Sequence, residues 1–207
     1  RLIFTASATE ANNLAILGIA RALSDRPGRV IISSIEHASV IEPAEALLEA
    51  GWRLETLPVW PSGVVRTDAL PGLLQPAAGD ATTRLVSVIL GNHETGVLQP
   101  VAQLAAICAE QNTPLHTDAA QVVGKVPVDF RRLGVAAMSF GAHKFGGPVG
   151  IGGLLLRHDT PLRPILFGGH HQDGLRPGTE SVALAVGMAV ALEICTARRE
   201  EHLRQMA

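Results

Sequence analysis

Apolar runs of strand length alternate with segments of helical periodicity along most of the chain. We expect strands at residues 1–5, Arg29–Ser33, 52–57, 85–90, Leu115–Asp118, 137–140 and 151–157. We expect helices from about Ser7 onward and over residues 40–50, 67–74, Val101–Glu110, Phe130–Leu133 and 181–198, with a loop at 161–177. This alternation predicts βαβ crossovers. Because the strands are apolar on both sides, it predicts a mostly parallel sheet between two helical layers, a three-layer αβα fold of the α/β class.

Five clusters of polar residues follow the predicted strands, each at the point where its strand ends. They lie at residues 7–9, 36–37, 92–94, 116–121 and 139–144. In open parallel sheets, ligands bind beyond the carboxyl ends of the strands, so these clusters belong to one edge of the sheet. In a chain with 47% hydrophobic residues, we interpret them as parts of one composite site.

Lys144 is the sharpest candidate for chemistry at that edge. Only two of the 17 Lys and Arg residues are lysines, Lys125 and Lys144. Lys125 lies in a predicted surface connection, where a solvated charge is the simpler interpretation. Lys144 follows a strand beside His143, and Asp118 ends a neighbouring strand. An amine and a carboxylate in this arrangement suit Schiff-base chemistry with an aldehyde.

Pyridoxal 5'-phosphate (PLP) is the cofactor that matches these residue types. It needs a lysine for a Schiff base, an acid for its ring nitrogen, a phosphate-binding turn and a group stacked on its ring. The candidates are, in that order, Lys144, Asp118, the turn formed by Ala8 and Thr9, and His37. Ser7 and Glu10 have capping-box spacing, so a helix should start at this turn and its N–H groups could bind a phosphate. An ordinary helix cap is the alternative interpretation of the turn.

Composition and charge argue against several other classes of protein. The 207 residues carry a formal charge of −2 and no basic block, so nothing predicts nucleic-acid binding. No apolar run approaches the roughly 20 residues that cross a membrane. No set of histidines and carboxylates has metal-site spacing, so we expect no metal. Cys108 and Cys195 lie in apolar helical patterns, which are typical of buried thiols in a reducing compartment.

The glycine-rich residues 146–153 resemble a nucleotide-binding loop only superficially. They lack the G-x-x-x-x-G-K-[ST] pattern and lead into a strand rather than a helix. We interpret them as a turn that needs positive φ angles.

Six segments, in order along the chain, match motifs of one enzyme family. They are residues 4–10 (FTASATE), 36–37 (EH), 92–96 (NHETG), 116–121 (HTDAAQ), 141–144 (GAHK) and 176–180 (RPGTE). Together they resemble the class V aminotransferase family, and the NHETG and RPGTE segments point to its cysteine desulfurase and selenocysteine lyase branch. The resemblance covers essentially the whole chain. It implies the PLP-binding large domain of the aspartate aminotransferase-like fold.

The resemblance implies a role for each matching residue of the ring-binding site. Lys144 matches the family's Schiff-base lysine, and Asp118 matches the aspartate that pairs with the pyridinium nitrogen. His37 matches the histidine stacked on the ring, which is also a candidate for proton transfer. Gln121 matches the residue that contacts the phenolate oxygen of the ring.

Further matches concern the phosphate and the second subunit. Ala8 and Thr9 match the phosphate-binding turn, and His143 matches a histidine that helps to bind the phosphate. Thr179 matches a threonine that reaches the phosphate held by the other subunit, so the resemblance implies a homodimer.

The sequence departs from the family pattern at three cofactor positions. His93 stands where an asparagine usually lies beside the ring, and imidazole is bulkier and can titrate. Gly141 stands where the phosphate site usually has a serine, which removes one hydroxyl donor. Ser7 replaces a usual glycine.

The implied activity is that of a cysteine desulfurase, which converts L-cysteine to L-alanine and passes the sulfur to an enzyme cysteine. Selenocysteine lyase, another class V enzyme or a scaffold without catalysis are the alternatives. The family's acceptor cysteine and small domain would lie beyond Ala207, and we expect the chain, truncated at both ends, to be inactive or impaired alone. A sulfur-acceptor protein is an expected partner, and the cytoplasm is the expected compartment.

Overall fold

A seven-stranded sheet forms the centre of the molecule. A computed structural model describes residues 1–23, 26–75 and 81–206. The strands are β1 (Leu2–Thr5), β2 (Arg29–Ser33), β3 (Arg53–Leu57), β4 (Thr83–Ser87), β5 (Leu115–Asp118), β6 (Ala137–Gly141) and β7 (Gly152–Leu156). Their order in the sheet is β1-β7-β6-β5-β4-β2-β3. All neighbours are parallel except those of β7, which runs antiparallel to both β1 and β6. The predicted mostly parallel sheet is confirmed.

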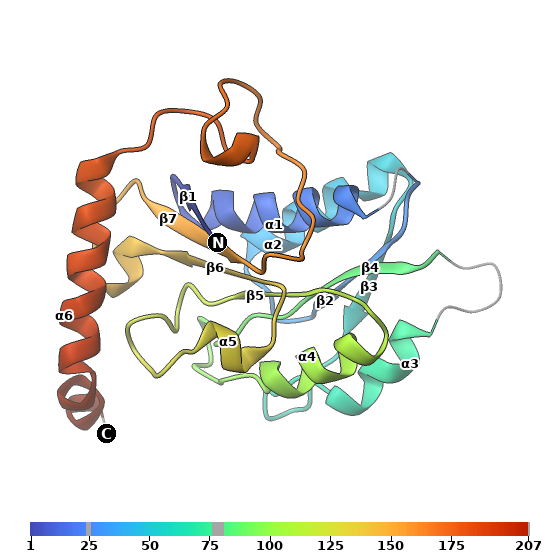
Figure 1. The fold of residues 1–207 in the computed structure, drawn as a ribbon. Coiled ribbons are helices and arrows are strands. Elements are labelled where there is room, and N and C mark those ends of the chain that lie inside the picture. Colours follow the sequence, from blue (N-terminus) through green and yellow to red (C-terminus); the bar gives the residue numbers. More distant parts are fainter. Residues whose placement is uncertain (24–25, 76–80, 207) are drawn as a thin grey trace.

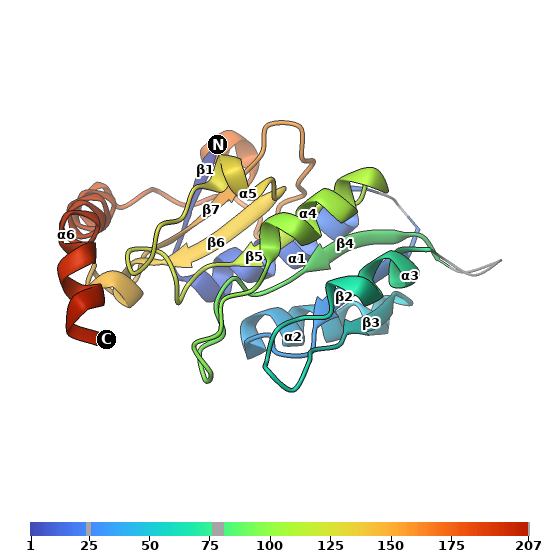
Figure 2. The same ribbon diagram turned by 90° about the horizontal axis from the view of Figure 1, so that it is seen from below.

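Helices cover both faces of this sheet and complete the three predicted layers. They are α1 (Ala8–Ala22), α2 (Ala38–Ala46), α3 (Leu70–Leu74), α4 (Val101–Glu110), α5 (Phe130–Leu133) and α6 (Val182–Met206). α1 and α2 pack together on one face, whereas α3, α4 and α5 lie on the other (Figures 1 and 2). α6 stands apart from both layers and contacts the 3₁₀ turn η3 (Ala142–Phe145), which follows β6 (Figure 1). Among the described helices, none is both long and apolar enough to cross a membrane.

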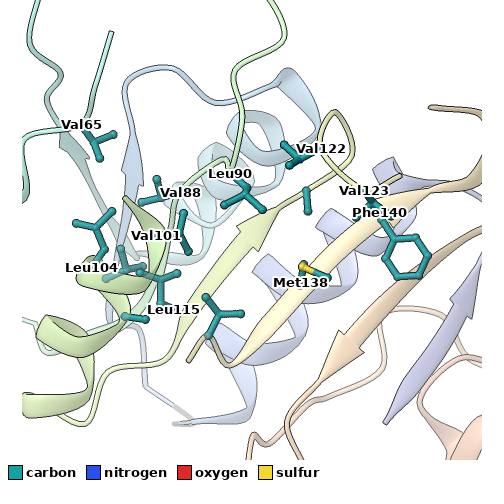
Figure 3. Close-up of a cluster of buried hydrophobic side chains, with 14 of the residues drawn as sticks. Val65, Val88, Leu90, Val101, Leu104, Leu115, Val122, Val123, Met138 and Phe140 are labelled. Atoms are coloured by element: carbon teal, nitrogen blue, oxygen red, sulfur yellow. The ribbon is translucent and has the colours of Figure 1, made fainter. Parts of the chain in front are cut away.

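Two clusters of apolar side chains bury the two faces of the sheet. One includes Ile16 of α1 and Val30 of β2. The other includes Leu104 of α4 and Leu115 of β5, which lie side by side with valine side chains in Figure 3. Burying one large aliphatic side chain stabilises a fold by about 1.5–3 kcal/mol. The clusters therefore fix the strands, and with them the residues that follow the carboxyl ends of the strands.

The fourth strand begins earlier and ends sooner than the predicted range of 85–90. The three apolar residues after β4 remain buried, and the first and third of them still bond to β5. The Val88 N–H donates to the His116 carbonyl at 3.1 Å, and the Leu90 N–H donates to the Asp118 carbonyl at 2.8 Å. The apolar run therefore indicates which residues are buried and does not mark where the regular strand ends.

Three helices also differ from their predicted ranges. The helix predicted over residues 67–74 divides into a 3₁₀ turn (Thr67–Ala69) and α3. The helix predicted over residues 40–50 begins at Ala38 and divides at Leu47 into α2 and the 3₁₀ turn η1 (Leu48–Ala50). The last helix continues to Met206, past the predicted end at residue 198. The turn predicted at 146–153 has positive φ angles at Gly146 (78°) and Gly150 (93°), as its composition suggested.

One side chain from the loop at 161–177 covers the free edge of β1. This loop contains the 3₁₀ turn η4 (Gln172–Gly174). Gln172 Oε1 accepts the N–H of Phe4 at 2.7 Å, and Gln172 Nε2 donates to the carbonyl of Phe4 at 3.0 Å. The two backbone groups of Phe4 that face away from β7 are therefore paired.

Candidate cofactor site

A cavity of about 220 Å³ lies at the carboxyl edge of the sheet, where the polar clusters were expected to meet. Eight of the predicted site residues line it: Ala8, Thr9, His37, His93, Asp118, Gln121, His143 and Lys144. Ser7, Ser39, Ile89 and Ala120 complete the lining. Residues more than 130 positions apart in the sequence therefore share one cavity, as the composite-site interpretation predicted.

The N-terminus of α1 forms one wall of the cavity. Ser7 has extended backbone angles, and its Oγ accepts the N–H of Glu10 at 3.1 Å. Glu10 Oε2 in turn accepts the N–H of Ala6 at 2.7 Å, so the predicted helix start is correct and the reciprocal bond falls one residue earlier than in a standard capping box. The first N–H groups of a 15-residue helix thus face a cavity that Ala8 and Thr9 line, which suits an anionic group.

Glycines allow β6 and β7 to pack directly behind this wall. Gly141 is buried and does not line the cavity. A Cβ at Gly141 would lie 3.2 Å from the Cβ of Ala8, and a Cβ at Gly152 would lie 2.9 Å from the backbone nitrogen of Ala8. Gly141 therefore supports the turn from behind rather than offering a donor to a ligand.

Asp118 lies at the end of β5 and is 3% exposed. Its Oδ2 accepts the side-chain N–H of Asn12 at 2.8 Å, and its Oδ1 accepts the N–H of Ala120 at 2.8 Å. Burial raises the pKa of the carboxyl group, and these two hydrogen bonds oppose the increase. A cationic N–H group in the cavity would compensate the buried charge, so the site is suited to a protonated ring nitrogen.

The two lysines lie closer together than the sequence suggested. Lys144 belongs to η3, directly after β6, and lines the cavity. Lys125 is half-buried and donates to Gln121 Oε1 at 3.0 Å. Burial lowers the pKa of Lys125, and repulsion from Lys144 lowers it further. The interpretation of Lys125 as a solvated surface charge is therefore wrong: this side chain supports the wall of the cavity.

The bond from Lys125 also decides how Gln121 faces the cavity. An ammonium group has only donors, so the atom of Gln121 that it contacts must be the carbonyl oxygen. The Gln121 NH₂ group is then the end left for a ligand. An N–H donor at this position matches an anionic oxygen, such as the phenolate oxygen of a PLP ring.

Two histidine rings meet edge to face at the cavity. The ring centroids of His37 and His93 lie 5.2 Å apart, with an interplanar angle of 76°. His37 caps α2, because its Nδ1 accepts the N–H of Ser39 at 3.1 Å. His93 thus lies beside the residue expected to stack on the ring, at the position where the resemblance implies an asparagine.

Thr179 is exposed and does not line the cavity of its own chain. The preceding loop is fastened to α1 by Arg176, whose guanidinium donates to Glu10 at 2.7 and 3.1 Å. The predicted role of Thr179 at the site of a second subunit stays a prediction.

Neither cysteine lines the cavity. Cys108 is buried, and burial raises the pKa of its thiol to about 12. Cys195 is only partly buried, unlike the prediction, and its Sγ donates to the carbonyl of Phe145 at 2.9 Å. Both thiols are therefore placed for packing rather than for receiving sulfur from a ligand in this cavity.

Sequence reasoning missed Asn12, the buried partner of Asp118. Asn12 lies on the buried face of α1, among Ala11, Leu14 and Ala15. A polar side chain at a core position of an amphipathic helix needs a hydrogen-bond partner, and that mismatch was the available signal. Its partner lies 106 residues away, so the sequence pattern could not identify it.

Glu36 is a second buried acid beside the cavity, and sequence reasoning gave it no role. Its Oε1 accepts the N–H of Ile89 at 2.7 Å and a hydrogen bond from Ser33 Oγ, whereas its Oε2 has no hydrogen-bond partner among the described residues. Burial raises its pKa from the ordinary value of 4.5 to about 8, and the negative charge of Asp118 adds to the increase. Glu36 is therefore protonated in the folded chain at neutral pH.

This carboxyl group makes stability depend on pH. Between pH 4.5 and about 8 the unfolded chain loses the Glu36 proton while the folded chain keeps it. The contribution of Glu36 to the free energy of unfolding is fully present below about pH 4.5 and is lost as pH rises toward 8. In the unsubstituted chain, we expect this group to lower the free energy of unfolding by up to roughly 5 kcal/mol over that pH range. Glu36→Gln stays neutral at both pH values and should remove this decrease. Urea unfolding at about pH 5 and about pH 8 measures the free energy in both proteins.

Glu45→Gln is the matched control, because Glu45 is exposed on α2. Its free energy of unfolding should change between the two pH values by as much as in the unsubstituted chain. If Glu36→Gln also showed the change of the unsubstituted chain, the assignment of the pH dependence to Glu36 would be contradicted.

The donors and acceptors of the cavity fit PLP. The amine of Lys144, the buried carboxylate of Asp118, the N-terminus of α1 and the imidazole of His37 all line one space. The group that such a ring would pair with is the buried carboxylate of Asp118, whose hydrogen-bond donors among the described residues are both neutral. A mostly parallel α/β sheet with an amine, an acid and an anion-binding helix at its carboxyl edge defines a PLP-dependent class of fold.

Comparisons with known proteins agree with this class. The family model of aminotransferase class-V matches residues 1–207. The cysteine desulfurase IscS of Dictyoglomus turgidum is 38% identical over 205 residues, which are 99% of this chain and 51% of that protein. A solved NifS-like protein has a TM-score of 0.89 at 37% identity, covering 97% of this chain and 54% of its own. A structure of SspA in complex with cysteine has a TM-score of 0.85 at 35% identity, covering 93% and 55%.

The chain belongs to the aminotransferase class-V family, whose members use PLP. It spans about half the length of the curated relatives that it matches.

Proposed function

We propose that this chain is the cofactor-binding part of a PLP-dependent cysteine desulfurase-like enzyme. The reaction takes sulfur from L-cysteine, leaves L-alanine and passes the sulfur to an enzyme cysteine that lies outside this chain. The observation that carries the proposal is the single cavity in which Lys144, Asp118 and the N-terminus of α1 meet. Relatives named as cysteine desulfurases and a neighbour solved with cysteine support the choice of substrate.

Each residue has a role that follows from its chemistry. Lys144 Nζ would hold the cofactor, and as a free amine it would accept the α-proton of the substrate as a general base. Bound PLP supplies electron withdrawal from the α-carbon of the attached amino acid. Asp118 would keep the ring nitrogen protonated through a charge-assisted hydrogen bond. The Gln121 NH₂ group would bind the phenolate oxygen.

The remaining residues hold the ring and the phosphate. Ala8 and Thr9 would give backbone N–H groups to the phosphate, and His143, on the turn that carries Lys144, would be a further donor to it. His37 would stack on the ring face. His93 would give a bulkier donor than an asparagine beside the ring.

The covalent test locates the reactive amine directly. We expect borohydride treatment of the PLP-loaded chain to fix the cofactor to Lys144, as a mass increase on one peptide after digestion. Lys144→Ala should abolish the increase. Lys125→Ala is the matched control, because Lys125 is the other lysine of the chain and should not carry the label. A label on Lys125, or one that survives Lys144→Ala, would contradict the proposed site.

Product analysis tests the reaction itself. Alanine together with a persulfide identifies a desulfurase, selenide from selenocysteine identifies a lyase, and pyruvate identifies another class V reaction. This chain alone should turn over poorly, because neither Cys108 nor Cys195 lines the cavity.

A homodimer, a sulfur-acceptor protein and the cytoplasm complete the proposal. Exposed Thr179 is free to meet a second copy, and the Arg176–Glu10 ion pair holds its loop beside the N-terminus of α1. Cys108 and Cys195 are both free thiols, which supports a reducing compartment.

A further inference from the structure

A chain of hydrogen bonds, buried except at its His37 end, lies beneath the cavity and connects His37 with Asp118. Asn12 is at its centre and is fully buried. Its Nδ2 donates to Asp118 Oδ2 and to Ser39 Oγ, each at 2.8 Å. Its Oδ1 accepts a hydrogen bond from Ser139 Oγ. All the hydrogen-bonding atoms of this amide except one lone pair are therefore used within the network.

The orientation of the Asn12 amide follows from its partners. Asp118 already accepts the N–H of Ala120, and an ionised carboxylate has no donor to give. The atom of Asn12 that contacts Asp118 must therefore be the nitrogen. Once Nδ2 faces Asp118, its second hydrogen points to Ser39, so Ser39 Oγ acts as the acceptor in that contact.

The branch toward the sheet is neutral and consistent with this orientation. Ser139 gives its hydrogen to Asn12, so its Oγ accepts from His116 Nε2 at 3.1 Å. His116 Nδ1 then accepts from Ser87 Oγ at 2.9 Å. Burial lowers the pKa of His116 to about 3, so this ring carries one hydrogen, on Nε2. Every contact in this branch has one donor and one acceptor.

The branch toward the cavity ends at His37. Because Ser39 Oγ accepts from Asn12, its own hydrogen is available to His37 Nδ1, which lies 2.8 Å away. The backbone N–H of Ser39 donates to the same nitrogen at 3.1 Å. Two donors therefore converge on Nδ1, and the hydrogen of the neutral ring must lie on Nε2, the nitrogen left for a ligand.

We propose that Asn12 and Ser39 are positioning residues that hold His37 as the Nε2–H tautomer, so that His37 donates a hydrogen bond to a bound ligand and does not take a proton from it. The claim about the tautomer stands by itself, whereas the claim that His37 takes no proton from a ligand rests on the proposed PLP-dependent reaction. Since Nε2 already carries a hydrogen, its lone pair is not available to a substrate proton. Lys144 Nζ then receives the α-proton without a relay through His37.

The tautomer can be measured without cofactor or activity. Long-range ¹H–¹⁵N correlation spectra of the labelled chain distinguish a protonated from an unprotonated ring nitrogen, and His37→Gln assigns the signal. We expect a protonated Nε2 and an unprotonated Nδ1 in the unsubstituted chain. A protonated Nδ1 with an unprotonated Nε2 would overturn the proposal whether or not the chain binds PLP.

Ser39→Ala tests the hydroxyl relay. It removes one of the two donors to Nδ1 and should raise the ratio of Nδ1–H to Nε2–H about fivefold, as expected for one ordinary hydrogen bond. An unchanged ratio would remove the hydroxyl relay from the proposal. Asn13→Ala is the matched control on α1, because Asn13 donates to the carbonyl of Thr9 at 3.0 Å and takes no part in the network. The same shift in Asn13→Ala would overturn the assignment to Ser39.

The claim that His37 donates a hydrogen bond and takes no proton has a test of its own. His37→Gln keeps an N–H donor near the position of Nε2 but has no basic nitrogen, whereas His37→Phe keeps a ring without a donor. If His37 only donates, His37→Gln should retain α-proton exchange of a bound amino acid to within about tenfold and should exceed His37→Phe. A general base contributes roughly 10²–10⁴-fold, so a loss of that size in His37→Gln with normal cofactor binding would overturn the proposal.

Discussion

Replacing Asp118 with asparagine is expected to weaken PLP binding by roughly 10²–10⁴-fold. The carboxylate is 3% exposed, and its two hydrogen-bond donors in the described part of the chain, Asn12 and the N–H of Ala120, are neutral. Breaking a buried ion pair by removing one partner costs about 3–5 kcal/mol, and each 1.4 kcal/mol is a factor of ten in affinity. Titration of the cofactor-free chain with PLP, followed by its visible absorption, measures the change.

The same substitution should have a small effect on the cofactor-free fold. Burial raises the pKa of Asp118, so asparagine removes an unfavourable charge while it loses about one hydrogen bond, near 1 kcal/mol. Asp129→Asn is the matched control. Asp129 caps the short helix α5, where asparagine caps equally well, so PLP affinity should be unchanged. Equal losses of affinity in both variants, or none in Asp118→Asn, would contradict an ion pair with the ring nitrogen.

Gly152→Ala is expected to destabilise the fold by about 1–3 kcal/mol or more and to abolish phosphate binding. A Cβ at this position would lie 2.6 Å from the carbonyl carbon of Ser7, 2.7 Å from the carbonyl oxygen of Phe140 and 2.9 Å from the nitrogen of Ala8. All three are backbone atoms, so no side-chain rotation relieves the contact. The N-terminus of α1 must move away from β6 and β7, and the proposed phosphate site moves with it.

Urea unfolding gives the change in the free energy of unfolding, and inorganic phosphate binding can be followed separately by calorimetry. Gly72→Ala is the matched control, because Gly72 lies in α3 and a Cβ there meets no atom within 4 Å. That substitution should leave the site intact and should add stability of about 0.5–1 kcal/mol, as alanine does in a helix. A Gly152→Ala variant as stable as Gly72→Ala, with phosphate still bound, would show that the turn is not held by this close packing.

The sequence predicted the sheet well where burial and strand geometry coincide. β2 and β5 are buried throughout because helices cover both of their faces, and the prediction matches their ends. After Ser87 the chain stays buried although the regular strand has ended, so the apolar pattern predicted a strand that extends past the end of β4. The antiparallel direction of β7 depends on a short connection after η3, which an apolar run cannot reveal.

The cavity was predictable because parallel strands bring their carboxyl ends together. Asp118 and Lys144 follow adjacent strands, β5 and β6, and the topology alone places them at one edge. The support behind them was not predictable, since it depends on side-chain contacts between distant segments. Asn12 reaches Asp118 across 106 residues, and Lys125 turned out to hold Gln121 instead of facing solvent.

The contact between Gln172 and Phe4 has a consequence for how this protein behaves at high concentration. An outermost strand with open peptide groups is a template on which another polypeptide can be added, and so it promotes aggregation. The carboxamide of Gln172 imitates the peptide of a missing eighth strand, because it both donates to Phe4 and accepts from it. A single side chain thereby occupies the peptide groups of Phe4 and keeps them from pairing with another polypeptide.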